Sequence, residues 1–355
     1  MEFTRFEQAE GLIQQRELFN DAFPENRGAP AASVEHYRWK FHGAPFDPTS
    51  YEYQATENGR MLGYYAAIPY PYQLGERKVF GGMVCDVMTH SQARGRGVFT
   101  ELGRFSLAEM RATNLSFLTG YPIRPEVMGG HLRVGWRVAF ELPMYLRPLR
   151  ADAIMRAKRL SLLAPMANLA VSAYQAARRP RLSREYEGSV GEPRELLRSA
   201  PFAAFVERWS AGVRNRLVKS ADFYDWRLGA PGTRYRAFLV SQGDAVVAAA
   251  VGRAAQLHGI PSFALLDLMV LKGEEGALAT LYDEVDREAR RHEAEAIVTM
   301  MSRHRAREYQ LRRFGFLTSP FKFKLIVYPL DEVVPSEEIS AEEDWHLMWI
   351  DSDDL

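Results

Sequence analysis

Two arginines alternate with two glycines in the segment HSQARGRG, which begins at position 90. Gln92, Gly95 and Gly97 have the spacing Q-x-x-G-x-G, and Arg94 and Arg96 lie between them. Glycine lets the backbone approach a ligand closely, and arginine binds a phosphate through two parallel hydrogen bonds. The residue types and their spacing therefore predict a loop that holds a phosphate or a diphosphate.

The segments on either side of this loop would direct it toward a ligand. Met83–Thr89 is apolar and reads as a strand, and Val98, Leu102 and Phe105 recur at helical spacing after the loop. The first N–H groups of a helix have no partner inside the helix and carry a partial positive charge. A strand, a glycine-rich loop and a helix start together form an anion site.

This segment resembles the acetyl-CoA loop of the GNAT N-acetyltransferases, whose signature [R/Q]-x-x-G-x-[G/A] lies between the fourth strand and the third helix. The pair Gly135–Trp136 further along the chain is also similar to the family. The resemblance implies that the strand backbone and the loop bind acetyl-CoA. The cofactor-binding residues it implies are Val87, Met88, Thr89, Gln92, Arg94, Gly95, Arg96, Gly97, Val98 and Phe99.

GNAT enzymes transfer acetyl directly from the thioester to an amine, so the resemblance also implies an acid and a base. The acid is often a tyrosine four residues before the glycine of a GF-type motif. Here that position is His131, whose imidazole titrates near neutrality and could protonate the departing thiolate. The alternative is a surface or helix-end histidine, with Tyr121 or Tyr145, at strand ends, as substitutes for the acid.

The base has several candidates. Asp86 lies on the key strand, but its counterpart Asp267 occurs in the part of the chain that lacks the loop, which favours a shared structural role. Glu101 lies one turn into the helix after the loop. Its alternative to acting as the base is to stabilise the positive end of that helix electrostatically. Glu126 begins a short helix near the expected entrance of the acceptor. Some tandem GNAT enzymes active on aminoglycosides use the carboxyl terminus, which here is Leu355.

The sequence repeats itself at offsets of 180 to 187 residues. Four anchors recur in one order: Trp39 and Trp226 in Tyr-x-Trp-[Lys/Arg], Asp86 and Asp267, Gly135–Trp136 and Gly315–Phe316, and Pro148–Leu149 and Pro329–Leu330. In the first copy, Asn58–Gly59 predicts a hairpin between Tyr51–Glu57 and Arg60–Ile68. The predicted fold is α/β, with two tandem GNAT-like units that each have a mixed central sheet flanked by helices.

We expect four parts in the chain: a GNAT-like unit with the acetyl-CoA loop (1–150), a helical basic connector (151–221), a GNAT-like unit without the loop (222–330) and an acidic tail (331–355). Where the second unit should have its loop, it reads MVLKGEEGALATL, with Glu274 and Glu275 in place of the arginines. Carboxylates would repel a diphosphate, so one active unit is expected.

The connector and the tail differ from the rest of the chain in composition. Ala151–Ala177 reads as a helix that is kinked or broken near Pro165, with basic flanks. We favour a helix packed across the domain junction with a solvated basic face over peripheral contact with an anionic membrane surface. The tail has ten acidic residues and no Lys or Arg, which is typical of disorder, but its apolar end WHLMWIDSDDL is predicted to dock.

Composition narrows the classes of function. A length of 355 residues favours two domains, and 45 basic against 45 acidic residues argues against a dedicated nucleic-acid binder. The single cysteine, Cys85, excludes an internal disulfide and a cysteine metal cluster, and no metal is expected. The amino terminus has no signal-like pattern and no segment has the apolar length of a membrane span, so a cytoplasmic protein is expected.

The leading interpretation is an acetyl-CoA-dependent N-acetyltransferase that acts on a small amine. The Tyr-x-Trp-[Lys/Arg] openings and the Gly–Trp pair look like a tandem GNAT group often associated with bacterial polysaccharide biosynthesis, which makes an amino sugar the first candidate acceptor. One alternative is an aminoacyl transferase of the FemX type, which needs no CoA loop. Another is a non-catalytic CoA-binding or scaffold protein. The sequence leaves the oligomeric state open.

Overall fold

The computed structural model describes residues 1–332 and 334–353, and the chain divides into two compact units. Unit 1 comprises Met1–Phe140, Asn215–Thr233 and Phe323–Ala341, and unit 2 comprises Glu141–Arg214, Arg234–Lys322 and Glu342–Leu355. Each unit therefore contains segments from both halves of the sequence. Residues 141–150 lie in unit 2, whereas residues 222–233 and 323–330 lie in unit 1, so the compact units depart from the ranges 1–150 and 222–330 at these three segments.

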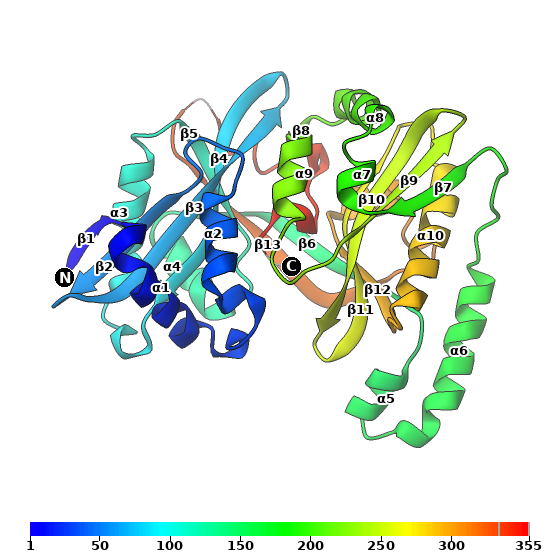
Figure 1. The fold of residues 1–355 in the computed structure, drawn as a ribbon, viewed down its shortest axis with the longest axis horizontal. Helices are drawn as coiled ribbons and strands as arrows, with labels where there is room; N and C mark the ends of the chain where they lie inside the picture. The colour runs from blue at the N-terminus through cyan, green and yellow to red at the C-terminus, as the bar shows by residue number, and fades with distance from the viewer. Residues whose placement is uncertain (333, 354–355) are drawn as a thin grey trace. The chain divides into compact units, whose positions relative to one another are not determined.

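Unit 1 is a mixed sheet with helices on both faces (Figure 1). Its strands follow the order β1-β2-β3-β4-β5-β13, in which β4 and β5 are parallel and the other neighbours antiparallel. The strands are β1 (Glu2–Arg5), β2 (Tyr51–Glu57), β3 (Arg60–Leu74), β4 (Arg77–Thr89), β5 (Leu115–Gly120), β13 (Leu317–Pro329) and the short β8 (Asn215–Leu217) beside β3. The helices are α1 (Gln8–Ala22), α2 (Val34–His42), α3 (Val98–Met110), α4 (Pro125–Arg133) and α9 (Ala221–Arg227).

The hairpin predicted at Asn58–Gly59 is confirmed. β2 and β3 pair antiparallel on either side of this dipeptide. Asn58 has φ 52° and Gly59 φ 75°, so both turn residues are in the left-handed region that the favoured two-residue hairpin turn requires.

Alternation along β3 assigns the helices to opposite faces of the sheet. Tyr65 belongs to the core cluster that contains Leu102 of α3. The ring of Tyr64 instead packs against Phe41 of α2, with the two ring centroids 6.1 Å apart. Successive side chains of a strand point to opposite faces. α3 therefore covers one face of unit 1, and α2 covers the other, together with α1 (Figure 1).

Unit 2 has the same strand pattern, in the order β7-β9-β10-β11-β12-β6, with β11 and β12 parallel. The strands are β6 (Arg137–Pro148), β7 (Glu187–Gly191), β9 (Arg236–Gln242), β10 (Ala245–Leu257), β11 (Ile260–Val270), β12 (Ala296–Met300) and the short β14 (Trp345–His346). The helices are α5 (Asp152–Ala157), α6 (Ala164–Ala177), α7 (Pro193–Leu196), α8 (Ala200–Ala211), α10 (Ala277–Arg291) and α11 (Arg303–Glu308). The matching patterns confirm the predicted fold of two similar α/β units.

The last strand of each sheet comes from the other half of the sequence. β6 is the last strand of the first repeat, but its residues Met144–Pro148 pair with β12 in unit 2. β13 is the last strand of the second repeat, but its residues Ile326–Pro329 pair with β5 in unit 1. This reciprocal exchange of strands, together with the placement of Asn215–Thr233 in unit 1, explains why the compact units do not follow the sequence repeat.

The repeated tryptophans contact one another within unit 1. Nε1 of Trp39 donates to the carbonyl oxygen of Trp226 at 2.5 Å, and Nε1 of Trp226 donates to that of Trp39 at 2.7 Å. Their rings stack with centroids 5.9 Å apart. Identical residues in identical roles are the signature of a pseudo-twofold relation between the two motifs.

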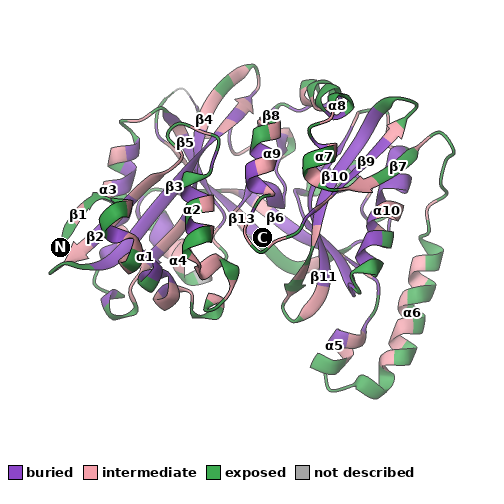
Figure 2. Cartoon of the chain, in the orientation of Figure 1, coloured by how far each residue is buried: buried purple, intermediate pink, exposed green. Residues whose placement is uncertain are grey.

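The connector helix is broken, as predicted. α5 ends at Ala157, and α6 begins at Ala164 with Pro165 in its first turn, where proline is tolerated. α6 packs on unit 2, where the hydroxyl of Tyr174 donates to the carbonyl oxygen of Gly315 at 3.3 Å. No residue of α6 is buried (Figure 2).

The apolar end of the tail docks on unit 2, as predicted. Its large side chains are all buried: Trp345, Leu347, Met348, Trp349 and Ile350. Nε2 of His346 lies 2.9 Å from the carbonyl oxygen of Leu268 in β11, and Nε of Arg305 donates to the carbonyl oxygen of Trp345 at 3.0 Å. The carboxyl-terminal residue Leu355, a candidate base, lies outside the described residues.

Candidate active site

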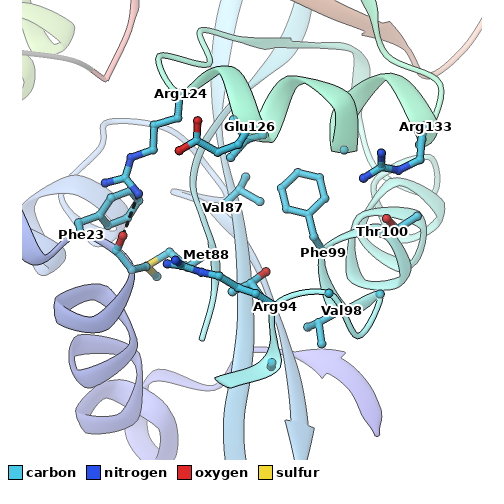
Figure 3. Close-up of a pocket in the computed structure, with 17 residues that line it drawn as sticks. Phe23, Val87, Met88, Arg94, Val98, Phe99, Thr100, Arg124, Glu126 and Arg133 are labelled. Atoms are coloured by element: carbon cyan, nitrogen blue, oxygen red, sulfur yellow. Dashed lines mark hydrogen bonds between the residues drawn. The ribbon is translucent and has the colours of Figure 1, made fainter. Parts of the chain in front are cut away.

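A cavity of about 480 Å³ lies in unit 1 where the end of β4, the arginine–glycine loop, the start of α3 and α4 meet (Figure 3). The end of α1 closes one side of it. The lining residues are Ala22, Phe23, Val87, Met88, Thr89, Ala93, Arg94, Gly95, Gly97, Val98, Phe99, Thr100, Arg124, Glu126, Val127, Gly130 and Arg133.

The end of β4 reaches the cavity because the two parallel strands of unit 1 separate there. β4 pairs with β5 as far as Val84, opposite Gly120, where β5 ends. β4 itself continues to Thr89. An irregularity in the pairing of β4 with β3 accompanies a positive φ of 47° at Asp86, and such bulges bend a strand. Backbone groups at the end of β4 can therefore bind a ligand instead of a neighbouring strand.

The loop leaves backbone donors unpaired. Gly95 and Gly97 have φ 78° and 83°, in the left-handed region that favours glycine, and Gly97 is the residue before α3. Among the described residues, four backbone N–H groups of the loop and the start of α3 have no hydrogen-bond acceptor: those of Gly95, Gly97, Val98 and Phe99. Unpaired N–H groups at a helix start form a suitable site for a diphosphate.

The loop is held in place by α1. The backbone N–H of Ser91 donates to Oδ2 of Asp21 at 2.6 Å, and the Ser91 hydroxyl donates to Oδ1 at 2.8 Å. Burial opposes the ionisation of Asp21, but the two hydrogen bonds from Ser91 outweigh it and lower the pKa of this carboxyl. Asp21 is therefore a charged anchor for the loop at neutral pH.

Three arginines from different parts of unit 1 surround the cavity (Figure 3). Arg124 is held in place, because its Nη1 donates to the carbonyl oxygen of Ala22 at 2.9 Å and its Nη2 pairs with Glu25. Arg94 and Arg133 form no hydrogen bond or ion pair with any residue that the structure describes. Their charges are available to an anionic ligand.

The inner wall contains an unpaired hydroxyl and a fixed ring. Oγ1 of Thr89 is buried without a hydrogen-bond partner among the described residues. Such a group costs about 1–3 kcal/mol, which a polar ligand atom would offset. The ring of Phe99 lies so close to Gly130 that a Cβ there would be 2.3 Å from a ring carbon. These features fit a ligand with an anionic end and an amide-bearing arm, such as an acyl-CoA.

Most of the residues expected to bind the cofactor meet in this cavity. All ten line it except Gln92 and Arg96. Oε1 of Gln92 accepts a hydrogen bond from Nη1 of Arg60 at 3.0 Å, and Nη2 of Arg96 lies 2.8 Å from both carboxylate oxygens of Glu57. These two side chains hold the loop to β2 and β3. The assignment of the other eight to acyl-CoA binding stays a prediction.

Of the four predicted catalytic residues, Glu126 alone lines the cavity. Asp86 lies on the face covered by α2, where Nζ of Lys40 is 2.8 Å from Oδ1. Its counterpart Asp267 is also buried, and Oδ1 accepts a hydrogen bond from the N–H of Leu268 at 3.1 Å. Tyr121 is buried just after β5, outside the lining. The substitute Tyr145 belongs to unit 2, and burial raises its pKa.

His131 is buried beside the cavity and does not line it. Its ring packs edge-on against Phe99 and Trp136, with centroids 5.1 and 5.3 Å away. Burial lowers its pKa to about 4, so the ring is neutral near pH 7. Nδ1 has no hydrogen-bond partner among the described residues. This environment favours a packing role, and the role of His131 as an acid stays a prediction.

Replacing His131 with phenylalanine should make the stability of unit 1 less sensitive to acid. Histidine titrates near 6.5 in the unfolded chain. Between about pH 6.5 and 4 the unfolded chain therefore binds more protons than the folded protein, and the free energy of unfolding decreases as the pH is lowered. At pH 5 this cost is about 2 kcal/mol, which the variant avoids. Urea unfolding at pH 8 and pH 5 measures the difference.

The variant should still lose some stability between these pH values because of His36. Burial and the nearby charge of Lys40 lower the pKa of this histidine to about 4. A 100-fold loss of kcat in a fully folded H131F would instead support the acid role.

The corresponding loop of unit 2 is filled by its own side chains. The carboxylate of Glu275 accepts a hydrogen bond from the N–H of Gly273 at 3.0 Å, and Tyr186 donates to Glu274 at 3.0 Å. The ring of Tyr186 also lies against Gly276, where a Cβ would be 3.0 Å away. The N–H of Gly273 is paired and the ring of Tyr186 fills the space beside Gly276, which supports the expectation of one active unit.

Several residues that line the cavity were not predicted from the sequence, chiefly Phe23, Arg124, Val127 and Arg133. Phe23 follows α1, and the other three belong to α4 or precede it. The loop motif carries no information about these segments. Only their position beside the start of α3 brings them to the cavity, although the arginines at both ends of α4 are a weak charge signal.

Comparison with known proteins agrees with this geometry. Residues 4–139 match the family described as an acetyltransferase (GNAT) domain. No curated protein sequence matches the chain at a significant level.

Several solved structures share the fold over most of the chain. A GCN5-related N-acetyltransferase from Anabaena variabilis has a TM-score of 0.65 at 11% identity, covering 93% of this chain and 73% of that one. A probable N-acyltransferase from Enterococcus faecalis has a TM-score of 0.64 at 11% identity, covering 93% and 72%. An N-myristoyltransferase from Saccharomyces cerevisiae with bound myristoyl-CoA has a TM-score of 0.62 at 10% identity, covering 92% and 78%. At these identities the likeness establishes the fold.

The sequence match over residues 4–139 and the shared fold of the two α/β units both indicate a GNAT architecture.

Proposed function

We propose that unit 1 transfers an acetyl group from acetyl-CoA to a small amine, with an amino sugar as the first acceptor to test. One observation carries this proposal. The end of β4, the unpaired N–H groups of the loop and the free charges of Arg94 and Arg133 all border one cavity. The diphosphate would lie on the loop and the start of α3, and the thioester would lie near the gap beyond Val84, where β4 and β5 separate.

Glu126 is the proposed base, because it is the only carboxylate among the described residues that line the cavity. It is exposed at the start of α4. It would accept the proton that the ammonium of the acceptor must lose before its nitrogen attacks the thioester carbon. The new C–N bond forms as the carbonyl oxygen becomes an oxyanion, which backbone N–H groups at the end of β4 would stabilise. The C–S bond then breaks as the new amide nitrogen loses its remaining extra proton, and the CoA thiolate takes up that proton to leave as the free thiol.

Glu126→Gln should lower kcat by about 100-fold or more and leave the affinity for acetyl-CoA within about threefold. The amide keeps the shape of the side chain but cannot accept the proton. Steady-state kinetics with varied acceptor and acetyl-CoA would measure both values. Glu101→Gln is the matched control, since Glu101 lies on α3 outside the cavity lining. An unchanged kcat in E126Q would reject Glu126 as the base.

Titration calorimetry with acetyl-CoA, followed by release of free thiol with a panel of amines, tests the function itself. Tight binding and turnover with an amino sugar is the expected result. Binding without turnover on any amine would favour the non-catalytic CoA-binding protein. The absence of binding would reject the site and favour an acyl transfer without CoA, as in the FemX type. Turnover with peptide amines alone would keep the enzyme class and replace the acceptor.

A further inference from the structure

The segment that joins β6 to β7 exposes an unusual amount of apolar surface. Its helices α5 and α6 lie outside the sheet of unit 2, and α6 is exposed along its outer face (Figure 2). The side chain of Leu162 is 96% exposed, Leu169 73% and Met166 71%. Leu160 and Leu163 are each nearly half exposed. Contiguous apolar surface of this kind on a folded protein marks an interaction site.

The orientation of α6 is set by polar contacts on its inner face. Oδ1 of Asn168 accepts a hydrogen bond from the N–H of Ala151 at 2.7 Å, and its Nδ2 donates to Oδ1 of Asp152 at 3.0 Å. About two helical turns after Asn168, Nε2 of Gln175 donates to the carbonyl oxygen of Pro148. The helix is thus anchored to unit 2, and its apolar residues face outward while it is anchored. Met166, Leu169, Ala170 and Ala173 recur at i, i+3, i+4 and i+7 on that outward face.

Positive charge surrounds this apolar face. The stretch from Ala153 to Arg184 contains seven Lys or Arg residues and no Asp or Glu, although the chain as a whole has equal numbers of basic and acidic residues. α6 itself carries no charged residue. The cations lie at its two ends: Arg156, Lys158 and Arg159 before it, and Arg178, Arg179, Arg181 and Arg184 after it. Among the described residues, five of these side chains have no hydrogen bond or ion pair: Lys158, Arg159, Arg179, Arg181 and Arg184.

We propose that α5, α6 and the turn between them dock on the surface of an anionic lipid bilayer. An apolar face bordered by cations complements acyl chains beneath a layer of negative headgroups. A second copy of this chain would bring seven like charges against seven, which opposes self-association through this face. The sequence had favoured a helix packed across the domain junction, but the outward apolar face favours the membrane.

The contact would be interfacial. No helix in the described part of the chain is both long and apolar enough to cross a membrane. The 14 residues of α6 span about 21 Å, less than the roughly 30 Å of a hydrocarbon core. Leu162, Leu163 and Met166, at the turn and the start of α6, would enter the headgroup region. This inference does not depend on the proposed function, since it uses no residue of the cavity.

Flotation of the full chain with vesicles tests the proposal. One set is pure phosphatidylcholine, and in the other about a third of the lipid is phosphatidylglycerol. We expect binding to the anionic set alone. The triple variant L162S/M166S/L169S should abolish it, and K158Q/R179Q/R181Q should weaken it by about fivefold per charge removed. Ile13→Ser, at a 76% exposed site on α1, and Arg38→Gln, at an exposed site on α2, are the matched controls that should bind normally.

Each other outcome overturns the proposal. Equal binding by the wild type and the triple serine variant, with loss of both in about 0.5 M salt, would show adsorption by charge without insertion. No binding to either set would reject the membrane. Self-association that L162S/M166S/L169S abolishes, without vesicle binding, would assign the face to a second copy. We expect all the variants to be folded, because the replaced side chains are exposed, and circular dichroism with thermal unfolding would check this.

Discussion

Replacing Arg94 with glutamate is expected to raise the KM for acetyl-CoA by about 100-fold with a smaller effect on kcat. A charge-assisted hydrogen bond to a phosphate is worth about 1.5–3 kcal/mol, and every 1.4 kcal/mol is a factor of ten. The glutamate also places a carboxylate beside the diphosphate. Arg94 forms no hydrogen bond or ion pair with the described residues and interacts with the anchored Asp21 only through its field, so its replacement leaves no buried charge unpaired. The fold should therefore stay intact.

Arg104→Glu is the control for this experiment. It makes the same change of charge on α3, at an exposed arginine outside the cavity lining that pairs with Glu101 at 2.6 Å. Its KM should stay within about threefold of the wild-type value. Calorimetry with acetyl-CoA gives the same comparison without turnover. Equal affinities of R94E and R104E would exclude the loop as the diphosphate site, and with it the central point of the proposed function.

Ending the chain after Glu343 should prevent unit 2 from folding. The truncation removes Trp345, Leu347, Met348, Trp349 and Ile350, whose side chains are at most 1% exposed. Loss of one buried tryptophan costs about 3–5 kcal/mol, and a domain has only about 5–15 kcal/mol of net stability. Circular dichroism and thermal unfolding should show the loss. Retention of a cooperative wild-type transition would contradict the docking of the tail.

This result changes the test for a base at the carboxyl terminus. Loss of activity in a chain that ends after Glu343 would reflect unfolding, whichever group is the base. A chain that ends after Ser352 keeps every tail residue that is buried in the described part of the structure, which extends to residue 353. It should unfold within about 2 °C of the full chain and keep its turnover if Glu126 is the base. Lost turnover in this folded variant would assign the base to the last residues instead.

Local sequence carries the loop and the elements around it. The spacing of Gly95 and Gly97 requires two left-handed backbone positions, and the apolar strand before them and the helical periodicity after them predict where the loop begins and ends. Each of these features depends on residues within a few positions of one another. The hairpin at Asn58–Gly59 is predictable for the same reason. The internal repeat predicts two similar α/β units, because similar sequences adopt similar folds.

Long-range pairing decides the rest of the fold. Nothing in the sequence near β6 or β13 distinguishes pairing with the sheet of its own repeat from pairing with the other. Each has the alternating pattern of a strand, and the exchange depends on the edge that β5 or β12 presents after folding. Residues 141–150 and 323–330 therefore carry no local sign of the unit to which they belong.

The sequence by itself determined an arginine–glycine loop between a strand and a helix, its absence from the second half and the likeness of the two halves. The tertiary structure decided which groups meet at that loop. It brought Arg124, Glu126 and Arg133 to the cavity, placed His131 behind it and turned the apolar face of α6 outward. The physical reason is range. Backbone conformation follows from neighbouring residues, whereas the side chains of a site and the exposure of a helix face depend on packing between segments far apart in the chain.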